Sequence, residues 1–203
     1  LHGLVRDKHN RKFSKSLGNG VDPLLMIDRY GTDALRFGLA ETMSPAEDIR
    51  FDERAFDSAK KLANKVWQAS RFALMHHGRM GRPAWPMPML TLADANDPRM
   101  EPHDLLILDS LETLKKPVTA DLEAHRFREA AFVLRHWFKD DLCDVYIEAI
   151  KNRLYDQQDP QALATLLHCL DQGLRLLHPF MPFLTERIWG AFHDGDLIAA
   201  DWP

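Results

Sequence analysis

Residues 160–177, PQALATLLHCLDQGLRLL, decide the fold class because their leucines recur every three or four positions. This spacing places one apolar side of a helix against a core. Asp159 directly before Pro160 is typical of a helix start, since its carboxylate can cap free N–H groups and proline suits the first turn. The stretch therefore predicts a helix from Pro160, and its apolar face consists of Leu163, Leu166, Leu167, Leu170, Leu174 and Leu177.

Two helical patterns directly precede this stretch, after residue 103, and one follows it. Leucines from Leu105 to Leu114 predict a helix that stops before Pro117, because proline inside a helix removes a hydrogen bond. Apolar residues from Phe127 to Ile150 predict a longer helix. Pro179 and Pro182 predict a break after the 160–177 helix. A last helical segment then resumes, marked by Leu184, Ile188 and Trp189.

A further helical pattern begins at Asp52 and continues to about His77. Its apolar stripe consists of Phe56, Ala59, Ala63, Val66, Ser70 and Ala73. Residues 78–103 are rich in proline and show little periodicity, so they predict a linker or a long loop. Helices of this length with one apolar side pack as an antiparallel bundle. We therefore expect residues 52–203 to form a helical-bundle domain.

Residues 1–51 are shorter and more mixed in pattern. Leu4 and Val5 predict the end of a strand, and residues 49–51 predict a very short second one. Between them, a helix is expected from Pro23 to Gly31, behind a cap at Asp22. A second helix, capped by Thr32, is expected from Asp33 to about Met43. The predicted inward residues are Leu24, Ile27, Tyr30, Leu35 and Leu39. The chain is thus expected to be mainly α, with a small α/β part before the bundle.

Composition limits the possible functions. The chain has 203 residues, 45% of them hydrophobic, and a formal net charge of −4, so it can form a core but is unsuited to coating nucleic acid non-specifically. We expect no membrane span and no signal peptide. A cytoplasmic location is expected because nothing in the sequence resembles a disulfide framework. Two cysteines without a Cys-x-x-Cys pair predict no metal site. The first residue is not methionine, which suggests a piece of a longer protein.

One short segment stands out against this acidic background. Residues 11–20, RKFSKSLGNG, gather three cations, two hydroxyls and two glycines in ten residues. Such a string is also typical of a solvated turn. Its context favours a functional loop, because Leu17-Gly18-Asn19, Asp22-Pro23-Leu24 and the stretch from Tyr30 to Arg36 follow it in order.

This continuous pattern resembles the Lys-Met-Ser-Lys-Ser loop of the class I aminoacyl-tRNA synthetases, with Phe13 in the methionine place. The resemblance implies that the loop stabilises the phosphates of ATP, which arrives with Mg²⁺, while an amino acid is activated. Compact cations and hydroxyl donors suit the charge that develops on those phosphates. The expected catalytic residues are Lys12, Ser14, Lys15 and Ser16, of which Lys12 and Lys15 would bind ATP.

Other stretches narrow the resemblance to the valyl-tRNA synthetase family. They are residues 48–53 (DIRFDE), 64–72 (NKVWQASRF), 143–148 (CDVYIE) and 177–186 (LHPFMPFLTE), with Val145 departing from a usual tryptophan. The resemblance implies a monomeric parent enzyme that activates valine and transfers it to tRNA(Val). It also implies that residues 1–21 end the catalytic domain, 22–51 form a stem-contact connector and 52–203 bind the anticodon. The His-Ile-Gly-His signature is missing, so the chain alone is expected to be inactive.

Four residues of the helix after Asp52 are candidate tRNA contacts. Lys65 and Phe72 are seven positions apart, so they face one way, with Asn64 and Arg71 beside them. A ring, cations and an amide on one edge suit an unstacked base and its phosphate. The alternative is that Phe72 belongs to the core and the cations to a solvated face.

Two other functions remain open at this stage, namely an isoleucyl-type synthetase fragment and a tRNA-binding module without catalysis. Among the remaining candidates, we expect core or helix-contact roles rather than ligand roles for Trp67, Trp137 and Trp189, because tryptophans on amphipathic helices are mostly buried. Asp144 and Glu148 are expected to form surface ion pairs with Lys151 and Arg153.

Overall fold

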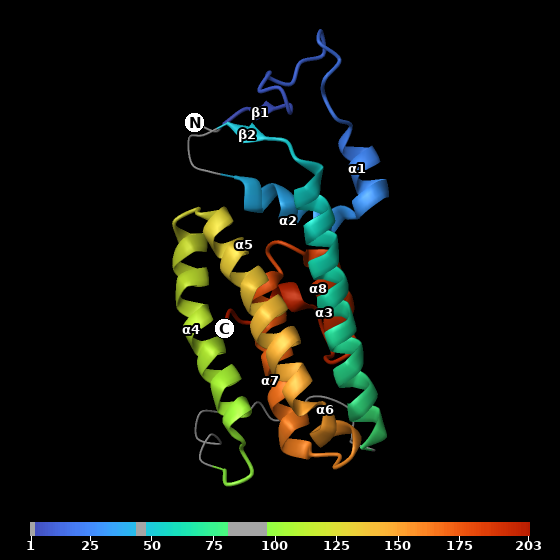
Figure 1. Cartoon of the computed structure of the whole chain (residues 1–203), viewed down its shortest axis with the longest axis vertical. Coiled ribbons are helices and arrows are strands. Elements are labelled where there is room, and N and C mark those ends of the chain that lie inside the picture. Colours follow the sequence, from blue (N-terminus) through green and yellow to red (C-terminus); the bar gives the residue numbers. More distant parts are fainter. Residues whose placement is uncertain (1–2, 44–47, 81–96) are drawn as a thin grey trace.

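The long helices of the chain lie side by side in a bundle, and the smaller N-terminal elements sit on one end of it (Figure 1). The structure, a computed structural model, describes residues 3–43, 48–80 and 97–203. The predicted fold class, a mainly α bundle with a small α/β part in front, is confirmed. Most of the linker predicted over 78–103 lies outside the described residues, although its two ends belong to helices.

The N-terminal part pairs two short strands that are far apart in the sequence. Strand β1 (Val5–Arg6) runs parallel to β2 (Ile49–Arg50), with Val5 opposite Ile49. Helix α1 (Pro23–Tyr30) begins as predicted, since the Asp22 carboxylate accepts a hydrogen bond from the Leu24 amide at 2.9 Å. Of the predicted inward residues of α1, Tyr30 packs against the core and Ile27 is half-buried, but Leu24 was wrong because it is exposed, and Met26 is buried instead.

Helix α2 (Thr32–Thr42) connects this part to the bundle. Its N-cap is Gly31 at φ +92°, and no side chain caps it, so the predicted cap by Thr32 was wrong. The φ of Gly31 lies in the left-handed region, which glycine tolerates without strain. The predicted inward residues Leu35 and Leu39 are only half-buried. The core-facing side chains of the helix are instead those of Ala34, Phe37 and Ala40.

Helix α3 (Glu53–Arg79) is the long helix predicted from Asp52, whose carboxylate accepts a hydrogen bond from the Arg54 amide at 3.0 Å. Its buried residues include Phe56, Ala59 and Val66, as the spacing predicted. The predicted core role of Trp67 was wrong, because Trp67 is 37% exposed. Its neighbour Val66 takes the core position instead, and the helix turns the indole toward solvent.

Helix α4 (Pro102–Glu123) continues through Pro117, so the predicted stop before this proline was wrong. Pro117 and Thr113, whose carbonyl loses its helical partner there, are both exposed. Water can therefore satisfy the freed carbonyl. The opposite side of the same turn buries Leu114 and Val118, and this packing holds the helix together across the proline.

The helix predicted from Phe127 to Ile150 is continuous but changes its winding in the middle. It consists of α5 (Phe127–His136), a π-helical stretch η2 (Trp137–Tyr146) and α6 (Ile147–Tyr155). The core residues that the spacing marked, such as Leu134, Phe138 and Ile150, are fully buried. Trp137 is buried as expected. A periodic apolar pattern predicts a helix but does not reveal a wider turn inside it.

Helix α7 (Pro160–Leu177) begins where the sequence predicted, since the Asp159 carboxylate accepts hydrogen bonds from the amides of Gln161 and Ala162. The predicted break follows, and α8 (Pro182–Trp189) resumes at its second proline. A short 3₁₀ turn, η3 (Leu197–Ala199), lies near the end of the chain. Trp189 is buried, as expected.

Gly173 on α7 allows close packing of the two rings at the start of the π-helical stretch. A Cβ atom added there would lie 2.8 Å from Phe138 Cζ and 2.9 Å from Trp137 Cζ3. Both rings are buried in the core, so moving them away would disturb their packing. The site therefore excludes any side chain larger than that of glycine.

The Gly173→Ala variant is accordingly expected to be about 1–3 kcal/mol less stable than Gly78→Ala. Both substitutions replace a helical glycine by alanine, but no atom of the described residues lies within 4 Å of a Cβ at Gly78. Urea unfolding of both variants measures the difference. Equal stabilities would show that the Trp137 and Phe138 rings can move at little cost.

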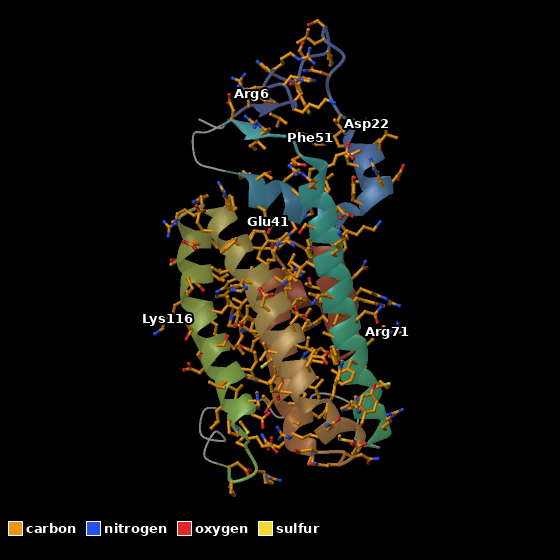
Figure 2. All side chains as sticks on the ribbon, viewed as in Figure 1. Arg6, Asp22, Glu41, Phe51, Arg71 and Lys116 are labelled. Atoms are coloured by element: carbon orange, nitrogen blue, oxygen red, sulfur yellow. The ribbon has the colours of Figure 1, made fainter. Side chains whose placement is uncertain are left out.

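Polar contacts attach α2 to two parts of the bundle. The Arg135 guanidinium on α5 donates to both carboxylate oxygens of Glu41, and its Nη1 also donates to Ser58 Oγ on α3 at 2.9 Å. The Asp33 carboxylate accepts hydrogen bonds from the amides of Phe183 (3.3 Å) and Leu184 (2.6 Å) at the start of α8. Glu41 faces the end of the bundle in Figure 2. These contacts tie the N-terminal part to the bundle through α2.

Candidate functional site

The Asp7 carboxylate organises the basic loop from its base. Its Oδ1 atom accepts hydrogen bonds from the amides of His9 and Arg11, both at 2.9 Å. Its Oδ2 atom accepts from Arg11 Nε at 2.9 Å and from Asn19 Nδ2 at 3.0 Å. The hydrogen bond from Asn19 contributes most to holding the pKa of Asp7 well below its ordinary value, and the bonds from Arg11 and His9 lower it further. Asp7 therefore stays ionised and joins the two ends of the loop.

Asn19 closes the loop from its other end. Its Oδ1 atom accepts a hydrogen bond from the Ser14 amide at 2.9 Å, and its Nδ2 atom also donates to the Lys12 carbonyl at 3.2 Å. Its amide group therefore contacts both the start and the middle of the loop. An asparagine suits this position because its side chain carries both a donor and an acceptor.

The candidate catalytic residues lie on the outer side of this loop, which projects from the end of the molecule (Figure 1). Lys12, Lys15 and Ser16 are exposed, and Ser14 is half-buried, with its hydroxyl 2.7 Å from that of Ser16. The side chains that could bind phosphate are thus accessible to solvent, while Asp7 and Asn19 hold the loop backbone through hydrogen bonds.

Phe13 packs in the opposite direction, toward the protein. Its ring lies 5.6 Å from that of Phe51, and the Phe51 ring lies 5.4 Å from that of Phe56 on α3. Figure 2 labels Phe51 at the base of the loop, where β2 leads into α3. Three aromatic rings therefore connect the loop to the first turn of the long helix.

Three of the four candidate tRNA contacts lie together in an open groove between α3 and the η2–α6 segment. The groove has a volume of about 580 Å³, and Asn64, Lys65 and Phe72 line it. Arg71 does not line it, although it is exposed beside Phe72, and its Nη1 lies 3.4 Å from Gln68 Oε1. Arg71 is also exposed on α3 in Figure 2. The spacing of the residues thus predicted this shared face, except for Arg71.

Acidic side chains line the opposite wall of the groove. Lys65 forms an ion pair with Asp144 across it, and Lys151 Nζ lies 2.6 Å from Glu148 Oε1. The expected pairing of Glu148 with Lys151 is confirmed. The expected role of Arg153 was wrong, because Arg153 is buried and pairs elsewhere, with Asp104 and Asp159.

Cys143 also lines the groove but offers no reactive thiolate. Burial raises the pKa of its thiol to about 11, so the group stays protonated near neutral pH. Among the residues that the structure describes, no three His, Cys, Asp or Glu side chains gather in a way that could hold a metal ion. Within the same residues, no helix is both long and apolar enough to cross a membrane.

Two families match the chain, one at each end. Residues 1–52 match the tRNA synthetases class I (I, L, M and V), and residues 104–203 match the anticodon-binding domain of tRNA ligase. The match along the whole length decides the assignment, because valine–tRNA ligases align with 100% of the chain at 42–45% identity. The chain belongs to the class I tRNA synthetases.

Individual class I synthetases show how much of such a protein the chain represents. The valine–tRNA ligase of Thermotoga maritima is 45% identical over 208 residues, and that of Geobacillus stearothermophilus is 43% identical over 208 residues. The chain spans about a fifth of the length of these relatives, 22% and 23% respectively.

A solved class I synthetase shares the fold. The crystal structure of the ternary complex of Agrobacterium radiobacter K84 agnB2 LeuRS-tRNA-LeuAMS matches with a TM-score of 0.72 and 26% identity. The match covers 100% of this chain and 23% of that one. The helical arrangement of this chain therefore occurs in a synthetase that was crystallised with tRNA.

Several residues of this synthetase segment could not be recognised from the sequence. Asp7 and Asn19 are twelve positions apart, and nothing in their spacing indicates that they share a hydrogen bond. Asp144 was considered only as a surface residue, because its partner Lys65 lies 79 positions away. A signal for Asp7 does exist, since an aspartate directly after a short strand often accepts backbone hydrogen bonds in a turn.

Proposed function

We propose that the chain is part of a valine–tRNA ligase, which activates valine with ATP and transfers it to tRNA(Val). The observation that carries this proposal is the alignment of the whole chain with valine–tRNA ligases at 42–45% identity. In this proposal residues 1–21 complete the catalytic domain, residues 22–51 connect it to the bundle, and residues 52–203 bind the anticodon. The intact ligase would act as a monomer in the cytoplasm.

The basic loop would stabilise the triphosphate of ATP. Lys12 and Lys15 are exposed and carry compact charges, and the hydroxyls of Ser14 and Ser16 lie beside them. The bonds of Asp7 and Asn19 preorganise the loop backbone, so less order has to be gained when the nucleotide binds. Mg²⁺ would arrive with the nucleotide.

The groove would bind unpaired nucleotides of the anticodon loop. The half-buried ring of Phe72 offers a stacking surface, and the Asn64 amide can form hydrogen bonds to a base edge. Phosphate groups would compete with Asp144 for Lys65, which makes the groove selective for RNA that also stacks. Arg71 would contact the phosphate backbone from outside the groove.

Pyrophosphate exchange on the intact protein tests the proposal. We expect exchange that depends on valine much more strongly than on isoleucine, followed by charging of tRNA(Val). Preference for isoleucine would identify an isoleucyl-type enzyme instead. Binding of tRNA with no exchange for any amino acid would identify a binding module without catalysis.

The Phe72→Ala variant is expected to weaken tRNA binding by about 1–3 kcal/mol, because it removes the stacking surface. Trp67→Ala is the matched control, since Trp67 lies on the same helix, is exposed and does not line the groove. Equilibrium binding to tRNA(Val) transcripts at fixed salt measures both. A lower melting temperature with unchanged tRNA affinity would show that Phe72 is a core residue only.

A further inference from the structure

An aromatic cluster continues the groove toward the C-terminal end of α3. The rings of Phe72 and Tyr155 lie 6.0 Å apart, and the His76 ring lies 4.6 Å from the first and 4.7 Å from the second. Tyr155 is 49% exposed, whereas His76 is 1% exposed. His76 is thus the buried centre of the cluster. The Tyr155 ring is half open to solvent, and the Phe72 ring lines the groove.

His76 fills the space behind the two outer rings. Its Nε2 atom is buried and has no hydrogen-bond partner among the described residues. Burial lowers the pKa of His76 below its ordinary value, so the ring is neutral at physiological pH. Since the contacts of His76 with Phe72 and Tyr155 are both edge-on, His76 supports both rings without covering them fully.

One cation lies over the Tyr155 ring, and a second lies one helical turn before it. The Arg79 guanidinium carbon lies 5.7 Å from the centre of the Tyr155 ring, and Arg79 is exposed. Lys151 precedes Tyr155 by one helical turn on α6 and lines the groove. A half-exposed ring beside an exposed cation can stack on a nucleobase while the cation meets its phosphate.

We propose that Tyr155 is a second stacking surface for an unpaired nucleobase of the bound RNA, next to the one at Phe72, with Arg79 contacting the adjacent phosphate. The proposal rests on the function proposed above. The 6.0 Å between the two rings allows neighbouring nucleotides of one strand to reach both. The partner is single-stranded RNA, because a duplex keeps its base faces stacked inside.

Equilibrium binding of the intact ligase to tRNA(Val) transcripts at two salt concentrations tests the proposal. The Tyr155→Leu variant is expected to bind about 5- to 100-fold more weakly, while Tyr155→Phe binds like the wild type because it keeps the ring. Arg79→Gln is expected to weaken binding at low salt and to reduce the salt slope by about 1. This surface variant keeps the proposal testable if Tyr155→Leu fails to fold.

A double-mutant cycle identifies the nucleotide. Abasic substitutions are placed one at a time in the anticodon loop, and each is combined with Tyr155→Leu and with Phe72→Leu. We expect the loss of affinity of each protein variant to be non-additive with the abasic substitution at one nucleotide position. That position should differ between Tyr155→Leu and Phe72→Leu. No coupling of Tyr155 at any position, together with unchanged affinity of Tyr155→Leu, would overturn the inference.

The same measurements separate this inference from the proposed function. Valine-dependent pyrophosphate exchange is measured without tRNA, so it reports the catalytic reaction separately from RNA binding. If Phe72→Leu weakens binding and Tyr155→Leu does not, only the second stacking surface is disproved. If the wild type neither exchanges pyrophosphate nor binds tRNA(Val), the function itself is disproved.

Discussion

Replacement of Arg153 by methionine is expected to lower the free energy of unfolding by about 3–5 kcal/mol, because it leaves a buried carboxylate without its cation. Asp104 is 0% exposed, and its Oδ2 atom lies 2.9 Å from Arg153 Nη1. The same carboxylate accepts a hydrogen bond from the Tyr146 hydroxyl at 2.7 Å. Arg153 also pairs with Asp159, the residue that caps α7, at 2.8 Å. One guanidinium thus holds α4, α6 and the start of α7 together.

Urea unfolding of the chain, followed by circular dichroism, measures this loss. Lys151→Met is the matched control, because Lys151 lies two positions away and its pair with Glu148 is on the surface. We expect it to cost less than about 1 kcal/mol. Adding Asp104→Leu to Arg153→Met should recover part of the loss, since the unpaired charge is then removed. A similar small cost for Arg153→Met and Lys151→Met would contradict a buried charge network.

The second large effect is expected at the basic loop. In the intact ligase, Lys15→Ala should lower the rate of valyl-adenylate formation by about 10²–10³-fold, which is the usual cost of removing one preorganised donor from a developing charge. The KM for valine should change much less, because Lys15 would act on the phosphates. Valine-dependent pyrophosphate exchange measures both quantities.

Lys8→Ala provides the control for this variant. Lys8 is also exposed and lies near the base of the loop, but outside the KFSKS segment. We expect its exchange rate to stay within a few-fold of the wild type. Exchange by Lys15→Ala at nearly the wild-type rate would show that the loop does not stabilise the reaction.

The sequence predicted those helices whose start and apolar face are marked by neighbouring residues. Asp159 caps α7 and its leucines are buried, so both signals lie within a few positions of each other. The predicted helix end before Pro117 was wrong because contacts far away in the sequence determine whether the helix continues. Leu114 and Val118 pack into the core on either side of the proline, and that packing outweighs one lost hydrogen bond at an exposed turn.

The same limit applies to the site. The shared face of Lys65 and Phe72 follows from helical spacing, and the structure places both in one groove. The partner of Lys65 could not be inferred, because Asp144 reaches it only through the packing of α3 against η2. Tyr155 was likewise hidden, since only the structure shows that it joins Phe72 and His76.

The three rings of Phe13, Phe51 and Phe56 have a mechanical consequence. Helix α3 acts as a stiff rod, and about 24 Å of it separate Phe56 from Phe72 at a rise of 1.5 Å per residue. The first turn of this helix supports the basic loop through the three rings, and its middle lines the groove that we propose for RNA. A tilt of about ten degrees at one end shifts the other by about 4 Å over that length. If bound RNA tilted α3, the rings of Phe56, Phe51 and Phe13 would carry that movement to the base of the basic loop.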